Sequence, residues 1–153
     1  MIHTRKANTA DEYELARLMV MGSHDGDPNA LGGSAFASLL ISLGYALESP
    51  NYMVFVVSDD REMAGYVVVE RLPSPPWEHK DIAVASDLYV MPQHRNTKAA
   101  VTLLTFAVDA CRVMGYESIR FFMDAERPVA YVEKLGGKLV QYGYELPLDG
   151  GEK

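Results

Sequence analysis

Residues 87–101 read DLYVMPQHRNTKAAV, and this stretch decides the fold. Apolar residues alternate over Ile82–Val90, which predicts a β-strand that Pro92 ends. A polar turn follows, and the next segment, Ala99–Met114, is almost entirely apolar. Its few polar residues lie three or four positions apart, so they form one narrow stripe along a helix. Such a helix is typical of one that packs against a sheet.

The turn between this strand and this helix is a candidate anion-binding site. The first amides of a helix have no partner inside the helix, and the helix dipole adds partial positive charge there. Arg95 and Lys98 bring two cations to the turn. Ala99 and Ala100 are small enough to let a ligand approach the backbone closely. These residues fit a phosphate or pyrophosphate, and they also fit a plain helix start with two solvated cations.

The rest of the sequence predicts strands and helices in the order β-α-α-β-β-β-α-β-α-β. The further strands expected are Ile2–Ala7, Tyr52–Val57, Met63–Glu70, Ile119–Met123 and Leu139–Leu146, and the further helices are one that ends at Gly22, Ser34–Leu47 and Arg127–Leu135. Thr9 and Glu12 have the spacing of a capping box before the first helix. This order predicts an α/β (α+β) fold, with a mixed sheet of six to seven strands flanked by about four helices. No linker is visible, so residues 1–153 are expected to form a single domain.

The composition is that of an ordinary globular domain and excludes several functional classes. Hydrophobic residues make up 48% and charged residues 23% of the chain, so it is neither collagen-like nor disordered. The formal net charge of −7 disfavours binding to nucleic acid or to an anionic membrane, and it would attract a cationic substrate. With one cysteine, Cys111, no intrachain disulfide can form. We therefore expect a cytoplasmic protein.

Metal-binding and nucleophile motifs are weak in this sequence. The four histidines are dispersed and lack the spacing of zinc ligands, so no metal is expected. Cys111 lies in the middle of an apolar helical segment, where a cysteine is usually an inert core thiol.

Two motifs resemble the signature of the GNAT superfamily of N-acetyltransferases. Residues 88–95, LYVMPQHR, resemble the strand end that leads into the family's Arg/Gln-x-x-Gly-x-Gly/Ala signature. The signature itself corresponds to Arg95-x-x-Lys98-x-Ala100, with Lys98 at the position where the family prefers Gly. Downstream, Glu133-Lys134-Leu135-Gly136 is similar to the family's Glu-Lys-Leu-Gly run, and the two motifs occur in the family's order. The resemblance implies a GNAT-like fold.

In such proteins acetyl-CoA binds in a gap between two diverging strands, and an amine attacks its thioester directly. By resemblance, backbone amides of the turn hold the pyrophosphate, and the pantetheine arm runs along the strand that ends at Val90. The residues so implicated are Leu88, Tyr89, Val90, Arg95, Asn96, Thr97, Lys98, Ala99 and Ala100. The acceptor is expected to be a small-molecule amine or a lysine-bearing protein, and the resemblance also permits a homodimer.

Candidate catalytic residues follow from the same resemblance. Asp87 falls where many members place a Glu that acts as a base, directly or through water; a solvated or salt-bridged Asp at a strand bend is the other interpretation. Members often place a Tyr, as general acid, directly before the Glu of the Glu-Lys-Leu-Gly run. Val132 occupies that position here, so Tyr131, one residue earlier and ~100° around a helix, is the candidate acid; a tyrosine that packs against the sheet is the other interpretation.

Three aromatic residues, Trp77, Tyr66 and Tyr45, are candidates for lining the acceptor pocket. The two departures from the family pattern, at Lys98 and Val132, keep a second hypothesis open. In it the chain is a non-catalytic GNAT-fold protein, such as one encoded by a phage or an accessory gene, that binds CoA or acts through protein contacts. An enzyme should be stabilised by acetyl-CoA and consume it when given amines, whereas a non-catalytic protein should at most bind it.

Overall fold

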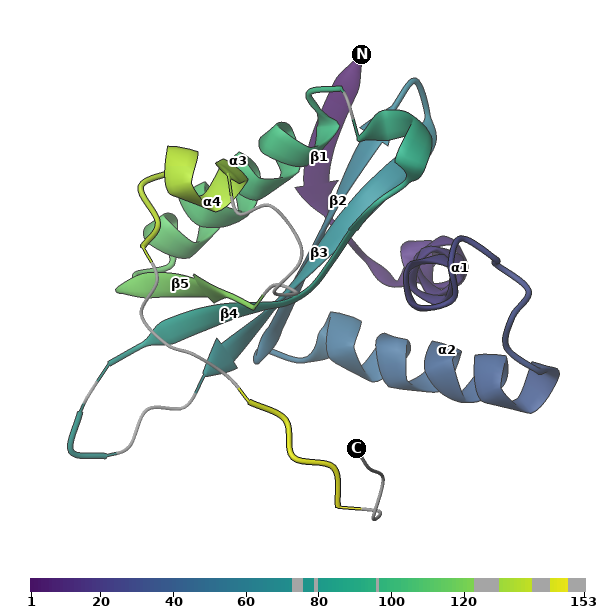
Figure 1. Cartoon of the computed structure of the whole chain (residues 1–153), viewed down its shortest axis with the longest axis horizontal. Coiled ribbons are helices and arrows are strands. Elements are labelled where there is room, and N and C mark those ends of the chain that lie inside the picture. Colours follow the sequence, from purple (N-terminus) through teal and green to yellow (C-terminus); the bar gives the residue numbers. More distant parts are fainter. Residues whose placement is uncertain (73–75, 79, 96, 123–129, 139–143, 149–153) are drawn as a thin grey trace.

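A central β-sheet organises the computed structural model, which describes residues 1–72, 76–78, 80–95, 97–122, 130–138 and 144–148, with 130 and 131 described by their backbone alone. The strands lie in the order β1-β2-β3-β4-β5 (Figure 1). Their bounds are Ile2–Lys6 for β1, Tyr52–Asp59 for β2, Glu62–Leu72 for β3, Ile82–Val90 for β4 and Ser118–Phe121 for β5. The first four strands are antiparallel neighbours, and β5 runs parallel to β4, which confirms the expected mixed sheet.

The described residues form five strands, fewer than the six to seven expected. The predicted last strand, Leu139–Leu146, begins outside the described residues, because 139–143 are not among them. Its described end, 144–146, is not part of the sheet. Tyr144 is 94% exposed and Leu146 is 79% exposed, so their apolar side chains have no sheet face to pack against.

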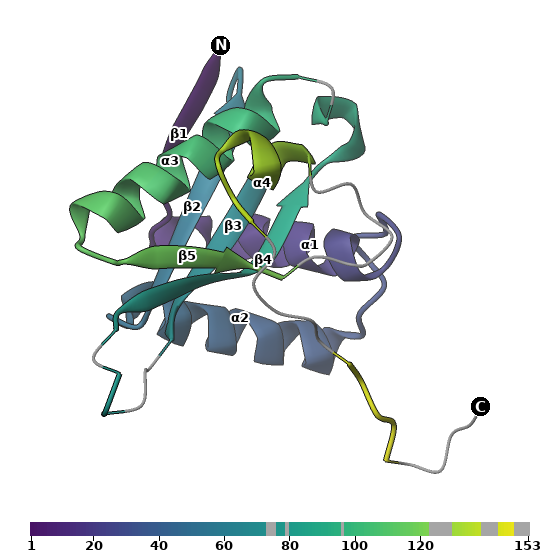
Figure 2. The same ribbon diagram turned by 60° about the vertical axis from the view of Figure 1, so that its left-hand side comes forward.

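Helices cover both faces of the sheet. A short 3-10 helix, η1 (Thr9–Asp11), leads into α1 (Glu12–Ser23), and α1 and α2 (Gly33–Glu48) pack on one face. Helix α3 (Ala99–Val113) crosses the other face, and α4 (Ala130–Lys134) lies beside it (Figure 1, Figure 2). The predicted start of this last helix, 127–129, lies outside the described residues. None of the described helices is long and apolar enough to cross a membrane.

Helix α3 packs on the sheet as predicted, but its exposed side is wider than the polar stripe. The buried face consists of Ala99, Ala100, Leu103, Leu104, Ala107 and Cys111, so buried positions recur every three or four residues. Burial raises the pKa of the Cys111 thiol to about 11, which agrees with an inert core thiol. On the outer side Val113 is 88% exposed, so apolar residues share this surface with the polar ones.

The capping box before α1 lies one residue earlier than predicted. Asn8 Oδ1 accepts from the Ala10 amide at 2.9 Å, and Asp11 Oδ2 accepts from the Asn8 amide at 2.9 Å. Thr9 and Glu12 do not form the box, because the chain first makes the 3-10 turn of η1. Asp11 is also held by Arg5, whose two terminal nitrogens donate to its two oxygens at 2.7 and 2.8 Å.

We expect Asp11→Asn to destabilise the fold in a pH-dependent way. Hydrogen bonds from Arg5 hold the pKa of the buried Asp11 carboxyl below its usual range. Since the folded pKa lies below the unfolded one, the carboxylate stabilises the fold above pH ~4 and loses this effect as pH falls. The free energy of unfolding should drop by about 1–3 kcal/mol at pH 7, and the difference from the parent should shrink towards pH ~3 in urea titrations.

The exposed pair Arg71–Asp81 provides the control for this prediction. Arg71 Nη2 lies 2.9 Å from Asp81 Oδ1, and both side chains are more than half exposed. Asp81→Asn should therefore change the free energy of unfolding by less than ~1 kcal/mol. An effect of Asp11→Asn that is the same at both pH values would show that the charge of this carboxylate does not stabilise the fold.

Candidate active site

A β-bulge in β4 determines where Asp87 points. In the ladder with β3, Asp87 pairs with Val68 and Ala85 pairs with Val69, so Ser86 is an extra residue. Ala85 belongs to the core beneath α3, whereas Val68 packs with the core beneath α1 and α2. Because side chains alternate along a strand, Asp87 without the bulge would share the α3 face with Ala85. The extra residue turns its carboxylate towards α1 and α2.

Strands β4 and β5 separate at the same place. Their parallel pairing joins Ile82–Ala85 to Ser118–Phe121 and stops there. Strand β4 continues for five residues, 86–90, with β3 as its only partner strand among the described residues. Among the described residues, no strand therefore pairs with the edge of β4 that faces away from β3, from the bulge to its end. This is the divergence of strands that the resemblance implies.

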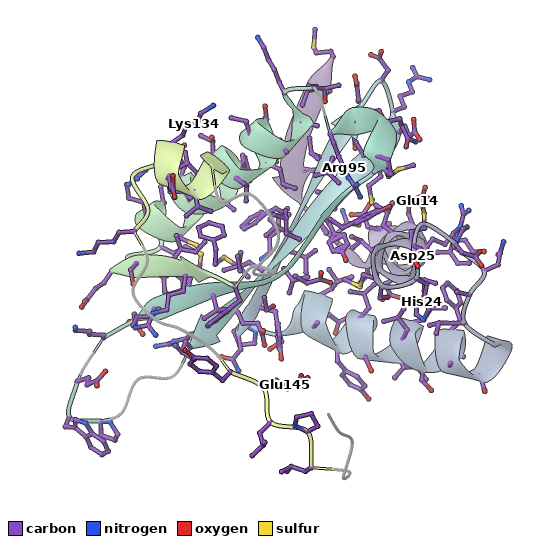
Figure 3. The ribbon with its side chains drawn as sticks, viewed as in Figure 1. Glu14, His24, Asp25, Arg95, Lys134 and Glu145 are labelled. Carbon is purple, nitrogen blue, oxygen red and sulfur yellow. The ribbon has the colours of Figure 1, made fainter. Side chains whose placement is uncertain are left out.

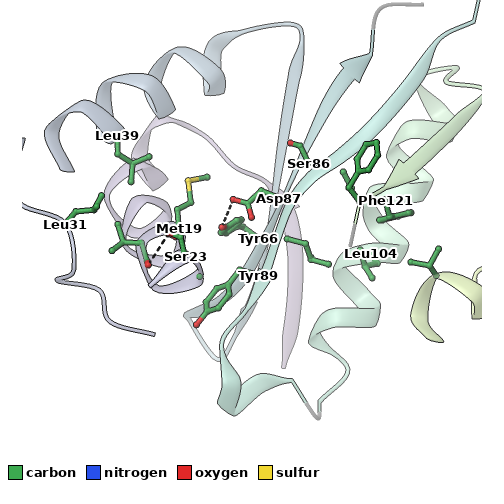
Figure 4. A pocket seen from close by; sticks show the side chains of 16 residues that line it. Met19, Ser23, Leu31, Leu39, Tyr66, Ser86, Asp87, Tyr89, Leu104 and Phe121 are labelled. Carbon is green, nitrogen blue, oxygen red and sulfur yellow. Dashed lines mark hydrogen bonds between the residues drawn. The ribbon is translucent and has the colours of Figure 1, made fainter. Parts of the chain in front are cut away.

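A cavity of about 490 Å³ occupies this gap and reaches both faces of the sheet (Figure 4). On the side of α1 and α2, its walls include Met19, Val20, Gly22, Ser23, Leu31, Leu39, Tyr66, Asp87 and Tyr89. On the side of α3 and α4, they include Leu88, Leu104, Phe121, Phe122 and Val132, and Ala85 and Ser86 lie between. A molecule in this cavity can thus contact both halves of the protein at the open edge of β4.

Asp87 is held by a buried tyrosine inside the cavity. The Tyr66 hydroxyl donates to Asp87 Oδ2 at 2.8 Å, and Tyr66 itself is 1% exposed (Figure 4). Burial, and then the neighbouring carboxylate, hold the pKa of Tyr66 far above its usual range, so the hydroxyl remains a donor. The other oxygen of Asp87, Oδ1, has no hydrogen-bond partner among the described residues. This carboxylate can therefore accept one further hydrogen bond or proton from a ligand.

The turn after β4 is fixed to the strand by Arg95. Its Nε donates to the Val90 carbonyl at 2.8 Å, and its guanidinium lies 5.6 Å from the centre of the Tyr89 ring (Figure 3). The 3-10 helix η2 (Pro92–His94) forms the first half of this turn. Arg95 remains exposed, so its terminal nitrogens are accessible to an anion at the turn.

The first turn of α3 contains two amides that have no hydrogen-bond partner among the described residues. Thr97 Oγ1 accepts from the Ala99 amide at 3.1 Å, and the Thr102 amide donates to the Lys98 carbonyl at 2.9 Å. The amides of Ala100 and Val101 lie between these two bonds and have no partner among the described residues. No described residue therefore competes with a ligand for these two amides, whereas Thr97 competes for the amide of Ala99.

Lys98 occupies the family's glycine position without strain. Its φ is −74° and its ψ is −1°, an ordinary helical conformation that any residue adopts. Its side chain is exposed, and its ammonium has no ion-pair partner in the part of the chain that the structure describes. The side chain is therefore accessible beside the open amides of α3.

The model of the acetyltransferase (GNAT) family matches residues 27–136 of this sequence. The chain belongs to the GNAT family. The match extends from the loop before α2 to the glycine after α4, and so includes the bulge, the open strand edge and the turn. Acetyl transfer is the activity of this family. No functionally curated protein matches the sequence.

Several solved structures share the GNAT fold at low sequence identity. A transcriptional regulator from Bacillus halodurans C-125 is similar with a TM-score of 0.80 at 17% identity, covering 97% of this chain and 100% of that one. A ribosomal-protein-alanine N-acetyltransferase from Brucella melitensis biovar Abortus 2308 has a TM-score of 0.74 at 13% identity, with 97% and 99% covered. An aminoglycoside acetyltransferase from an uncultured soil metagenomic sample has a TM-score of 0.74 at 16% identity, with 97% and 99% covered. At these identities the likeness concerns the fold.

Among the GNAT motif residues that we predicted, the structure brings most of the first motif together. Asp87, Leu88 and Tyr89 line the cavity, and the turn with Thr97 and Lys98 follows at the end of the same strand. Asn96 lies outside the described residues. In the second motif, Val132 lines the cavity from α4. Tyr131 belongs to the same helix, and its side chain lies outside what the structure describes.

Of the three aromatic residues expected in the acceptor pocket, only Tyr66 lines the cavity. Trp77 is 80% exposed and Tyr45 is 76% exposed, and neither is part of the walls of this cavity. Trp77 follows the proline-rich stretch of the sequence at 73–76, and Tyr45 is an exposed residue of α2. The residue type alone does not reveal whether an aromatic side chain points into a cavity or into solvent.

Sequence reasoning missed the role of His94. This histidine is 9% exposed, and its Nδ1 lies 3.6 Å from Asp59 Oδ2 while its Nε2 lies 3.4 Å from Glu62 Oε2. Both carboxylates belong to the ends of β2 and β3, where these strands form a hairpin. His94 thus connects the turn to the neighbouring hairpin. No local pattern marks this contact, since its partners lie more than 30 residues away.

Proposed function

We propose that this chain is an acetyl-CoA-dependent N-acetyltransferase that transfers an acetyl group to a primary amine by direct attack on the thioester. One observation carries the proposal: a carboxylate with a free oxygen, Asp87, faces a cavity in the gap between β4 and β5. That cavity lies along the strand whose end leads into the turn and into the open amides of α3. Membership of the GNAT family supports the same reaction class.

The residues of the gap and the turn fit acetyl-CoA, which supplies an activated acetyl thioester when bound. The outer edge of β4 at Leu88–Val90 suits a pantetheine arm, because no strand among the described residues pairs with it and it offers backbone groups besides the Val90 carbonyl, which accepts from Arg95. The pyrophosphate suits the amides of Ala100 and Val101, with Lys98 and Arg95 adding positive charge. In this proposal the amide of Ala99, already bonded to Thr97, contributes less than the sequence suggested.

Asp87 acts as the general base in this proposal. An ammonium nitrogen has no lone pair, so the amine must lose one proton before it attacks, and it loses a second proton as the neutral amide forms. Asp87 Oδ1 is free to accept that proton, while Tyr66 holds the other oxygen and fixes the orientation of the carboxylate. Tyr131, on the helix that contributes Val132 to the cavity, is the candidate donor of a proton to the thiolate that leaves. Holding both reactants in one cavity adds a further rate advantage.

The direct test combines binding and turnover. Acetyl-CoA at millimolar concentration should raise the melting temperature by a few degrees, because a ligand that binds only the native state stabilises it. A panel of primary amines should then release CoA thiol, detected with a thiol reagent, in amounts equal to the acetylated amine formed. Stabilisation without thiol release for any amine would contradict the proposed enzyme activity and favour a protein that only binds CoA.

We expect Lys98→Glu to weaken acetyl-CoA binding. The change places an anion beside the open amides of α3, where the pyrophosphate is proposed to bind. The Kd measured by calorimetry should rise by about tenfold at low ionic strength and by less at high salt. Lys6→Glu makes the same charge change on an exposed residue of β1 and should leave the Kd unchanged. Equal Kd values for the parent and Lys98→Glu would remove Lys98 from the site.

A further inference from the structure

The cavity wall around Asp87 is apolar and carries one charge. On the side of α1 and α2 the side chains in it are Met19, Val20, Leu31, Leu39, Tyr66 and Tyr89, together with Ser23 and Asp87. Of all the described residues that line the cavity, Asp87 alone is charged. Figure 4 shows Met19, Leu31 and Leu39 on the same side of the strands as Asp87. Asp87 itself is exposed, so an amine can reach its carboxylate from solvent, and the described walls on which the rest of the amine would then lie are hydrocarbon.

One of the two oxygens of the Asp87 carboxylate already accepts a hydrogen bond. Tyr66 donates to Oδ2, and this leaves Oδ1 as the oxygen that can pair with an incoming ammonium group. Tyr66 keeps its proton, because burial and the neighbouring carboxylate both disfavour its ionised form. The site therefore offers compensation for about one positive charge.

The acidic residues of the loop after α1 do not add a second negative charge to the cavity wall. Asp25 and Asp27 follow α1 in the chain, are exposed, and are not part of the cavity wall (Figure 3). Asp27 Oδ1 accepts from the Asn29 amide at 2.9 Å, as in a local turn. The overall charge of −7 can draw cations towards the protein, but it does not place a second anion among the described residues of the wall.

We propose that the acceptor is a primary amine with one positive charge on a small apolar body; this inference rests on the proposed N-acetyltransferase function. A polyamine or an aminoglycoside would press further ammonium groups against Met19, Leu31 or Leu39, where no charged group among the described residues of the wall compensates the loss of their hydration. The acceptor is small, because it shares about 490 Å³ with the acetyl-bearing end of the second substrate.

The test compares amines of different charge on the intact chain. With acetyl-CoA present, 2-phenylethylamine and hexylamine should be acetylated with kcat/KM at least about tenfold higher than spermidine or kanamycin. Without acetyl-CoA, 2-phenylethylamine should raise the melting temperature more than spermidine at equal ionic strength. Preference for spermidine or kanamycin would overturn the inference and leave the proposed function intact. Acetylation of none of these amines would overturn both.

A charge added to the apolar wall should change this preference. Leu31→Glu, on the loop between α1 and α2, supplies a second anion, and the ratio of kcat/KM for spermidine over 2-phenylethylamine should rise by about tenfold. Ile41→Glu makes the same change on the outer side of α2, where Ile41 is 63% exposed and outside the cavity wall, and it should leave the ratio unchanged. A ratio that rises equally in both variants, or in neither, would overturn the inference.

Discussion

Asp87→Asn is expected to lower kcat by about 10²- to 10⁴-fold, the usual contribution of a positioned general base. Asparagine keeps the size of the side chain, and its amide oxygen can still accept from the Tyr66 hydroxyl. The change therefore removes the proton acceptor and leaves the packing at the bulge in place. The Kd for acetyl-CoA should change by less than about twofold, because Asp87 does not belong to the turn that is proposed to hold the pyrophosphate.

Comparing the loss of kcat with the change in Kd for acetyl-CoA shows whether Asp87 is a general base or a structural residue. kcat is measured at saturating amine and acetyl-CoA, and the Kd is measured separately by calorimetry on the same preparation. Asp109→Asn provides the matched control, because Asp109 is exposed on α3 and pairs only with Arg112 among the described residues. This control should leave both quantities unchanged. A parallel loss of kcat and acetyl-CoA affinity in Asp87→Asn would indicate a structural aspartate at a strand bend, the other interpretation of the sequence.

The fold could be predicted well where a local pattern decides the structure. Strand β4 has the predicted bounds, Ile82–Val90, because an apolar alternation, interrupted at Asp87, marks its body and Pro92 follows its end. Helix α3 ends one residue before the predicted Met114. The capping box was misplaced because several small polar residues precede α1, and the 3-10 turn of η1 decides which of them caps. The predicted strand up to Leu146 needs a partner strand, and pairing over long distances leaves no local signal.

The candidate site also has one part that a local sequence pattern predicts and another part that it does not. The turn from Arg95 to Ala100 could be predicted because its residues are contiguous, so a strand end and a helix start bring them together. The apolar wall of the cavity could not be predicted from the sequence, because Met19, Leu31 and Leu39 come from segments more than 40 residues before Asp87. The bulge left one trace in the sequence, since Asp87 interrupts an apolar alternation. A single extra residue reverses the face of every later side chain, and its position is visible only in the ladder.

The end of β4 depends on a close approach between two backbones at Gly65. This residue pairs with Val90 in the ladder between β3 and β4. A Cβ atom added to it would lie 2.6 Å from the Tyr89 carbonyl oxygen and 3.1 Å from Val90 Cα. Both contacts are to backbone atoms, so no side-chain rotation can relieve them. The strands would have to move apart at the point where Arg95 binds the Val90 carbonyl.

Gly65→Ala is therefore expected to lower the free energy of unfolding by about 1–3 kcal/mol, as in other overpacked cores. It should also raise the KM for acetyl-CoA, since a displaced Val90 carbonyl shifts the turn that Arg95 holds. Urea unfolding and steady-state kinetics measure the two effects. Gly33→Ala is the control: its added Cβ meets nothing within 4 Å at the start of α2, so stability should stay equal or increase slightly. Equal stability of Gly65→Ala and the parent would show that β3 and β4 separate at this end without cost, and that the turn does not depend on their close contact.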